Sequence, residues 1–237
     1  MPKKPDSVML KPENNNRKQR LASALRQRIL TMEIAPGAVI DEVELAGEFG
    51  LSRPPIRELM RQMAGEGYIE LEANRPARAT AMSYHALRDF YLVAPMIYIA
   101  TTKLAAEHAR PEAIARLRAI QDQFRAAIKA GDLNARIFAN DAFHLEIGRM
   151  ARNVYLMPSL RRLLIDHARI ARTFYRDDFS DGGQLATAAD QHDQIIDAIA
   201  RRDPETAGGI VQAHMEISRR DMAAYAVPEG MELPPGF

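Results

Sequence analysis

The fold of this chain is decided by residues 41–65, which read DEVELAGEFGLSRPPIRELMRQMAG. A short helix is predicted over 42–48, and Gly50 suits the left-handed conformation that ends a helix. Ser52 is a favourable N-cap, and Pro54 falls in the first turn of a second helix, where its missing N–H costs little. The spacing therefore predicts two helices joined by a tight turn, which is a helix-turn-helix.

The residues around this stretch predict a small domain of their own. Ala46 is small where the two helices would cross, and apolar residues such as Leu59 recur at helical spacing on the second helix, so that it can dock. Downstream, 68–72 and 77–81 are short runs separated by a turn, which predicts a β-hairpin. We therefore expect a winged helix-turn-helix over residues 17–82.

Arginines give the second helix a chemically distinct face. Arg53, Arg57 and Arg61 are spaced four residues apart, so they project from the same side of the helix. Arginine forms bidentate hydrogen bonds with guanine in the major groove of DNA, and Ser52 at the helix start can hold a phosphate. An arginine stripe alone is more often a solvated surface. Its combination with the glycine turn and the hairpin favours DNA binding.

Overall charge does not by itself argue for nucleic acid. Residues 17–82 carry ten Lys and Arg against nine Asp and Glu, and the whole chain has a net charge of +1. The argument therefore depends on where the arginines lie. Among them are Arg75 and Arg78, which the hairpin would carry toward the minor groove or the DNA backbone.

From residue 83 onward the apolar periodicity becomes helical throughout. Six helical segments are predicted, over 83–110, 111–130, 132–151, 155–176, 184–201 and 203–225. Six helices of this length predict a bundle over 83–226, so the fold class is mainly α. We expect a flexible arm over 1–16, a loop over 177–183 and a loose tail over 227–237.

The composition excludes several classes of protein. There is no cysteine, which rules out a disulfide or a thiolate metal site and fits the reducing cytoplasm where we expect the protein to work. Hydrophobic residues make up 47% of the chain, which is enough for a sizeable core. No apolar run approaches the length of a membrane span, so no membrane partner is expected.

Three histidines of the predicted bundle draw notice. His144, His192 and His214 each occupy an apolar-face position on a different predicted helix, so all three could point into one core. Neutral imidazole is a good ligand for Zn²⁺ and related ions. A single such histidine is more often a core residue satisfied by hydrogen bonds, and periodicity alone does not show that the three converge.

The segment 19–80 resembles the winged helix-turn-helix of the GntR family. The matching run is IAPGAVIDEVELAGEFGLSRPPIRELMRQMAGEGYIELEANRPA, residues 34–77. The resemblance implies that the main DNA contacts are made by Ser52, Arg53, Pro54 and Arg57. Two positions depart from the family pattern. Val43 stands where a basic residue is common, and the glycine expected near Pro76 in the wing is absent.

The segment 83–226 resembles the all-helical FCD-type effector domain of the fatty-acid-regulator (FadR-like) branch of that family. The residues that carry the resemblance are Asn140-x-x-Phe143-His144, Asn153, His192-x-x-Ile195-Ile196-x-Ala198-Ile199-x-x-x-Asp203 and His214. It implies a divalent metal ion, zinc or else nickel or manganese, whose ligands are Asn140, His144, His192 and His214. An amide oxygen is a weaker ligand than the usual carboxylate. Asp141 is adjacent but points about 100° away from Asn140 on an ideal helix.

The two resemblances together imply a transcription regulator that responds to a metabolite. It would act as a repressor, bind a palindromic operator in double-stranded DNA as a homodimer, and be released by a small organic acid. Ala94 and Tyr98 replace an arginine and a glutamate that are common in the family. The loss of the arginine implies a different effector, or an effector carboxylate held mainly by the metal. Two alternatives are open: a metal-dependent hydrolase built on the three histidines, and a metal-free bundle that binds acyl chains.

Overall fold

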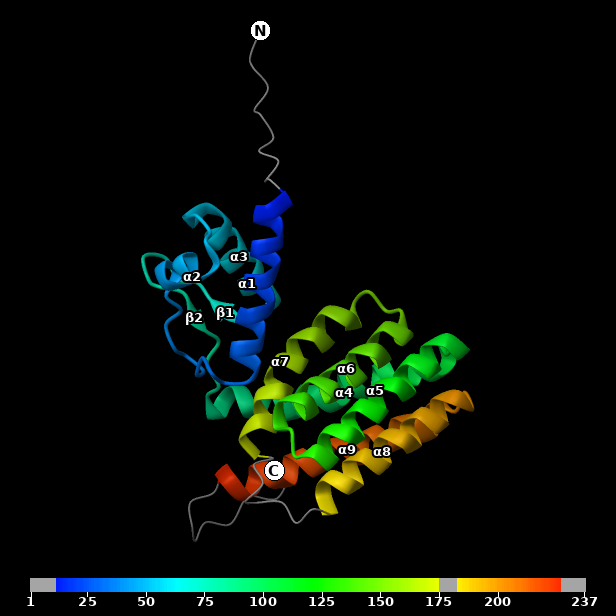
Figure 1. Ribbon diagram of the computed structural model, residues 1–237. Coiled ribbons are helices and arrows are strands. Elements are labelled where there is room, and N and C mark those ends of the chain that lie inside the picture. Colours follow the sequence, from blue (N-terminus) through cyan, green and yellow to red (C-terminus); the bar gives the residue numbers. More distant parts are fainter. Residues whose placement is uncertain (1–11, 175–182, 227–237) are drawn as a thin grey trace. The chain divides into compact units, whose positions relative to one another are not determined.

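The computed structural model describes residues 12–174 and 183–226 (Figure 1). The chain divides into two compact units, residues 1–81 and residues 82–237. The division falls one residue before the boundary predicted between 82 and 83. The predicted loop over 177–183 lies almost wholly outside the described residues, and so do the tail over 227–237 and the first part of the predicted arm.

The first unit, called the head below, has three helices and a short hairpin among its described residues. Its elements are α1 (Pro12–Leu30), α2 (Glu42–Phe49), α3 (Arg53–Glu66), β1 (Ile69–Glu70) and β2 (Arg78–Ala79). The expectation of an arm over 1–16 is wrong for residues 12–16, which belong to α1. Proline is well tolerated at the first position of a helix, because that position needs no N–H donor, so Pro12 opens the helix where the sequence had predicted a flexible segment.

The turn of the helix-turn-helix is built as the sequence predicts. The Asp41 carboxylate caps α2 by accepting hydrogen bonds from the N–H groups of Val43 and Glu44. Gly50 follows α2 with φ of +60°, a left-handed conformation that costs other residues free energy. Its carbonyl accepts a hydrogen bond of 3.1 Å from Nη1 of Arg17 on α1. Hydrogen bonds therefore fix the start of α2 at Asp41 and the turn after α2 at Gly50.

Ser52 occupies the N-cap position of α3 but does not cap it through its side chain. Its backbone is extended, with φ of −79° and ψ of 164°, yet its hydroxyl makes no capping hydrogen bond. The predicted position is thus confirmed and the predicted side-chain cap is not. The hydroxyl remains exposed at the start of the helix, where a ligand phosphate would lie.

The strands of the wing are shorter than predicted, and a third segment of the chain pairs with the hairpin. Ile69 pairs with Ala79 in an antiparallel hairpin of two residues per strand. Val39, which precedes α2, forms a bridge with Arg78, so the chain before the helix-turn-helix also joins the wing. Asn74 lies near the tip with φ of +61°. Asparagine tolerates this conformation better than most residues, so it serves where a glycine was expected.

The core of the head lies between α1, α3 and the hairpin. Leu21, Leu25 and Ile29 form a buried stripe on α1 and meet Ile56 and Leu59 of α3. Their spacing of three and four residues is what places them on single helix faces. The second helix of the motif is therefore fastened to the head by its apolar side, and its polar side is left for solvent.

The second unit, called the bundle below, contains six helices among its described residues (Figure 1). They are α4 (Tyr84–His108), α5 (Pro111–Ala130), α6 (Leu133–Ala151), α7 (Leu156–Phe174), α8 (Gly183–Ala200) and α9 (Pro204–Ala226). The predicted helices agree with these within about two residues, apart from any part of the fourth beyond Phe174. Ser83 and Asp132 cap α4 and α6 as predicted, and Asn153 accepts two backbone hydrogen bonds at the start of α7.

The main core of the bundle draws residues from all six helices. It includes Phe90 and Tyr98 of α4, Phe143 of α6 and Ile195 of α8, all buried. Within the described residues, no helix is both long enough and apolar enough to cross a membrane. Histidines and glutamines interrupt this apolar core at one place, which is the candidate site of the bundle.

Candidate functional site

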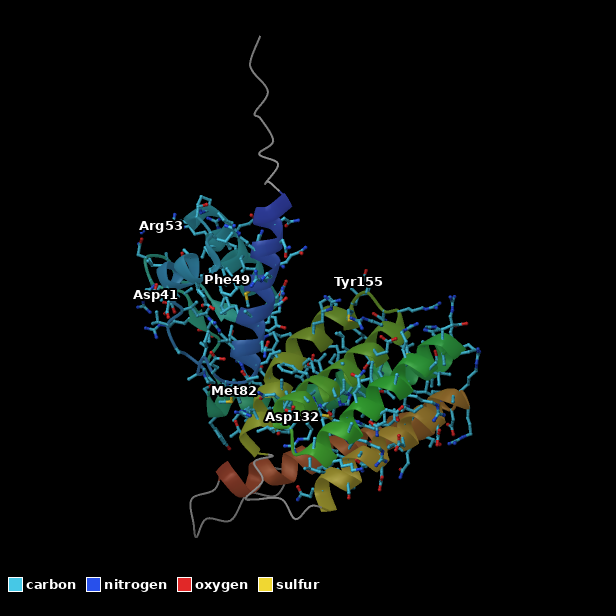
Figure 2. The ribbon with its side chains drawn as sticks, in the orientation of Figure 1. Asp41, Phe49, Arg53, Met82, Asp132 and Tyr155 are labelled. Carbon is cyan, nitrogen blue, oxygen red and sulfur yellow. The ribbon has the colours of Figure 1, made fainter. Side chains whose placement is uncertain are left out.

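The exposed face of α3 carries the three predicted arginines. Arg53, Arg57 and Arg61 are all exposed, and none forms an ion pair or a side-chain hydrogen bond with another residue in the part of the chain that the structure describes (Arg53 is labelled in Figure 2). The acidic residues of α3 are engaged elsewhere: Glu58 pairs with Lys18 and Glu66 with Arg26, both on α1. These pairs turn the acids toward α1 and leave the arginine face with uncompensated positive charge.

The two arginines of the wing are held in place. Arg75 pairs with Glu72 at 2.5 Å on the exposed tip. Arg78 donates a hydrogen bond of 2.9 Å to the carbonyl of Gly37, which ties the hairpin to the chain before α2. Arg78 therefore has a structural partner within the head, whereas the arginines of α3 are available for a ligand. Val43, where a basic residue was expected, is an exposed position on α2.

The three predicted histidines converge inside the bundle. His144 on α6, His192 on α8 and His214 on α9 are each less than a tenth exposed. One ring nitrogen from each histidine lies within 4.8 Å of the corresponding nitrogens of the other two. The ring centroids of His192 and His214 are 4.7 Å apart, and those of His144 and His192 are 5.4 Å apart. Three different helices thus bring three imidazoles to one point.

Two glutamines orient two of these rings. Nδ1 of His192 lies 3.0 Å from Oε1 of Gln121, whose own Nε2 donates to the carbonyl of Ala189 at 2.8 Å. Nδ1 of His214 lies 3.0 Å from Oε1 of Gln191. Because an amide oxygen can only accept, each Nδ1 carries the proton and each Nε2 keeps its lone pair. This is the tautomer in which Nε2 can bind a metal ion, held by an outer hydrogen bond as in known metal sites.

The remaining ring nitrogens fit a metal ion. Nε2 of His144 and Nε2 of His192 are buried without a hydrogen-bond partner in the structure. Burial, reinforced by the neighbouring histidines, lowers the pKa of both rings well below the usual value, and burial lowers the pKa of His214 to about 3. Neutral imidazoles with free lone pairs are the form that binds Zn²⁺ and related ions.

A fourth buried histidine adjoins the cluster and was missed by the sequence reasoning. His167 on α7 lies with its ring centroid 5.3 Å from that of His144 and shares a hydrogen bond of 2.8 Å with the hydroxyl of Tyr98. Burial lowers its pKa to about 4. The signal was present in the sequence, because Leu160, Leu164 and His167 form one buried stripe with helical spacing.

Asn140, one turn before His144 on α6, lies at a small cavity that the cluster also borders. It lines a cavity of about 30 Å³ together with His167, His214 and Arg136, and Arg136 is buried. This volume is roughly that of one water molecule, so the space can hold one small group such as an ion. Asn140 brings an amide oxygen that could act as a metal ligand to this space, and Arg136 brings a guanidinium group.

Asp141 is not part of the histidine group, although it is turned partly inward. Burial raises the pKa of its carboxyl to about 7, and its charge contributes, after burial, to the raised pKa of Tyr98. The histidines form the only group of three or more metal-binding His, Asp or Glu side chains found in the described part of the chain. Asp141 therefore lies close to the polar centre without joining its donor set.

Comparison with known proteins agrees with this architecture. Residues 17–78 match the bacterial regulatory proteins of the gntR family, and residues 95–217, more than half of the chain, match the FCD domain. The chain belongs to the GntR family of transcription regulators. The recognised segments coincide with the head and with most of the bundle, so this GntR-family chain has a winged helix-turn-helix and an all-α FCD domain.

Curated relatives of this GntR-family regulator share its organisation. The Nta operon transcriptional regulator of Aminobacter aminovorans is 26% identical over 76% of this chain and 82% of its own length. A probable D-xylose utilization operon transcriptional repressor of Paenarthrobacter nicotinovorans is 27% identical over 82% of this chain and 85% of its own. These relatives and the family are transcription regulators, so the hydrolase alternative is not supported.

Solved structures support the same fold. Escherichia coli McbR/YncC superposes with a TM-score of 0.73 at 17% identity, covering 88% of this chain and 96% of that one. A GntR transcriptional regulator from Rhodococcus sp. RHA1 gives 0.70 at 18% identity, covering 89% and 99%. At these identities the likeness concerns the fold.

Proposed function

We propose that this GntR-family regulator is a repressor that reads a palindromic operator through α3. The observation that carries the proposal is the set of three exposed arginines on α3, which have no acidic partner among the described residues. The N-terminus of α3 adds the free hydroxyl of Ser52 for a backbone phosphate. Arg53, Pro54 and Arg57 occupy the first two turns of α3, the part of a recognition helix that contacts base edges.

The DNA-binding proposal is tested by changing Arg57 to alanine. A palindrome is first selected from random duplexes with the wild-type protein, and binding is then followed by fluorescence anisotropy. Loss of one bidentate contact to guanine corresponds to about 1–3 kcal/mol, a roughly 5–150-fold weaker specific affinity. Lys129→Ala, an exposed charge removed from α5 of the bundle, is the matched control and should leave affinity unchanged. Equal specific affinity of the Arg57 variant would show that α3 does not read the operator.

A divalent metal ion, zinc or else nickel or manganese, completes our proposal for the bundle. His144, His192 and His214 would supply three imidazoles and Asn140 an amide oxygen, while the ion would offer a Lewis-acidic position to an organic-acid effector. Arg136, which lines the same cavity, would meet the carboxylate of that effector. In this proposal Arg136 binds the effector carboxylate, and it replaces the family arginine whose position is occupied here by Ala94.

The metal proposal is tested by elemental analysis of protein purified without a histidine tag. We expect close to one equivalent per chain in the wild type and its loss in His192→Ala. His85→Ala, which removes an exposed histidine of α4, is the control and should retain the ion. A wild-type content below about a tenth of an equivalent after incubation with zinc would contradict the site. Release from the operator by small carboxylates, screened separately, tests the effector.

A homodimer follows from reading a palindrome, because one helix-turn-helix covers a half-site. The bundle offers an apolar face for this on α4, where Leu92 is 68%, Met96 67% and Val93 42% exposed. We propose that a second copy covers this face. Leu92→Glu with Met96→Glu should shift the chain from dimer to monomer in analytical ultracentrifugation, whereas a monomeric wild type would refute it. As a DNA-binding regulator the dimer would act in the cytoplasm.

A further inference from the structure

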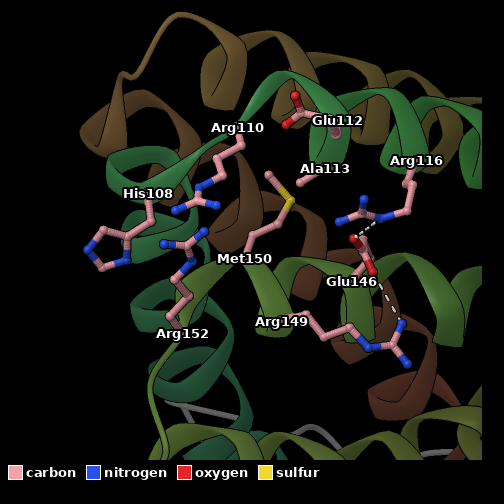
Figure 3. A pocket seen from close by; sticks show the side chains of 9 residues that line it. All are labelled: His108, Arg110, Glu112, Ala113, Arg116, Glu146, Arg149, Met150 and Arg152. Atoms are coloured by element: carbon pink, nitrogen blue, oxygen red, sulfur yellow. Dashed lines mark hydrogen bonds and ion pairs between the residues drawn. The ribbon is translucent and has the colours of Figure 1, made fainter.

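A second charged pocket lies on the bundle, away from the cluster of His144, His192 and His214 (Figure 3). Its volume is about 210 Å³, and it opens where the connection between α4 and α5 meets the end of α6. Its walls are formed by His108, Arg110, Glu112, Ala113, Arg116, Glu146, Arg149, Met150 and Arg152. Four arginines against two glutamates give the lining a net charge of +2, twice that of the entire chain.

Two of the four arginines share a single acidic partner at one wall of the pocket. Glu146 on α6 is buried and accepts hydrogen bonds from Nε of Arg116 at 2.9 Å and from Nη1 of Arg149 at 3.2 Å, drawn as dashed lines in Figure 3. A buried carboxylate held between two guanidinium groups is a rigid arrangement. It fixes Arg116 and Arg149 at the wall of the pocket.

The other two arginines are not paired with an acidic side chain among the described residues. Arg110 and Arg152 are exposed, and neither forms an ion pair or a side-chain hydrogen bond with any described residue. Figure 3 shows their guanidinium ends next to each other at the pocket, although they come from different connections of the bundle. Arg110 is also the N-cap of α5, where a positive charge opposes the helix dipole. Glu112 on the first turn of α5 is the nearest acid in sequence and offsets one charge.

We propose that this pocket binds a compact dianion, namely a phosphate group, either as the free ion or as part of a small phosphorylated metabolite. Arginines that converge from two connections match a tetrahedral oxyanion, because each planar guanidinium can donate two hydrogen bonds to it. The volume is below the roughly 300–1,000 Å³ of pockets for drug-sized ligands, which limits the ligand to a phosphate with a few additional atoms.

This anion pocket is distinct from the candidate effector cavity. It shares no lining residue with the cavity around Asn140, His167 and His214. Failure of the metal or operator proposals would therefore leave the phosphate proposal standing, and the reverse also holds.

The test is titration calorimetry of inorganic phosphate, and in a second arm glycerol 3-phosphate, into the full-length protein in a phosphate-free buffer. We expect saturable binding that is at least tenfold weaker in the double variant R110Q/R152Q. The control is R118Q, which removes an exposed arginine of α5. Arg118 pairs with Asp197 outside the pocket, so this variant should bind phosphate as the wild type does. Tighter binding of the ester would identify a phosphorylated metabolite, and equal binding would identify the free ion.

Stability provides the second measurement. Without phosphate, R110Q/R152Q should melt at the same temperature as the wild type or higher, because the substitutions relieve like-charge repulsion between exposed residues. Added phosphate should raise the Tm of the wild type more than that of the variant. The proposal is overturned if neither phosphate probe binds saturably, if the double variant binds as well as the wild type, or if malonate binds and phosphate does not. It is also overturned if R110Q/R152Q binds DNA more weakly than the wild type while its phosphate binding is unchanged.

Discussion

The head and the bundle handle their polar residues in opposite ways. On α3 of the head, Arg53, Arg57 and Arg61 are exposed and have no partner among the described residues. In the bundle, His192 and His214 are buried, and each ring is held by a glutamine. The first arrangement is ready for a large external ligand, and the second surrounds a small internal one.

The difference also concerns what stabilises each unit. All six histidines of the chain lie beyond residue 82, so the head contains none. The head depends on an apolar core with surface ion pairs such as Arg26–Glu66, which contribute little individually. The bundle contains buried groups whose neutrality matters to its stability. Low pH should therefore destabilise the bundle more than the head, and this difference can be tested.

The largest expected effect is acid unfolding of the metal-free bundle. The pKa of His167 is lowered to about 4 and that of His214 to about 3, from 6.5 in the unfolded chain. Depressed values mean that the stabilisation is complete above pH 6.5 and is lost as the pH falls toward the folded values. At pH 5, which is 1.5 units below 6.5, about 1.4 kcal/mol per unit gives a loss of about 2 kcal/mol for each ring.

His144 and His192 shift in the same direction, so the bundle should lose several such contributions. Hydrogen exchange followed by mass spectrometry at pH 7 and pH 5 would monitor the two units separately. We expect protection to fall in α4–α9 while the head keeps its own. Earlier loss of protection in the head would reverse the comparison.

A smaller effect is expected when Gln121 is changed to leucine. The variant deprives Nδ1 of His192 and the carbonyl of Ala189 of their partner while filling a similar volume. Loss of an outer partner of a metal ligand costs roughly 10–100-fold in affinity, which competition against a fluorescent zinc chelator would measure. Gln123→Leu, an exposed position on the same helix, is the control. Unchanged zinc affinity would mean that Gln121 does not orient the site.

The smallest effect distinguishes two caps within the head. Asp41→Ala removes a side chain that accepts two backbone hydrogen bonds and should cost about 1 kcal/mol of stability. Ser52→Ala removes a hydroxyl without a capping bond, so stability should stay the same while affinity for the operator falls. Thermal melts and anisotropy on both variants test this. A destabilised Ser52 variant with unchanged DNA affinity would assign the hydroxyl to the fold.

The head could be predicted from the sequence because its signals are local. Asp41, Gly50 and the prolines after Ser52 act within one or two turns, and the structure places them as expected. The bridge between Val39 and Arg78 could not be found this way, since it joins segments whose meeting depends on the folded wing. Asn74 likewise took the place of an expected glycine only because the turn conformation demanded it.

The candidate site of the bundle could be predicted only in part from the sequence. Periodicity put three histidines on apolar faces, but their convergence depends on how three helices pack, and the family pattern supplied that step. Gln121 follows Leu117 and precedes Phe124 on one buried stripe of α5, so a polar residue in an apolar pattern marked it. His167 had the same mark. Both could have been found by asking which polar residues interrupt a buried face.

The neutrality of the bundle site has a consequence for electrical balance. Three imidazoles, an amide at Asn140 and two supporting glutamines contribute no formal negative charge. A divalent ion held by these donors would keep its whole double charge in a buried place, where an uncompensated charge is costly. An organic anion that places its carboxylate beside the ion would supply the negative charge that these donors lack. Ion and anion would then bind better together than apart, each raising the affinity of the other by the same factor.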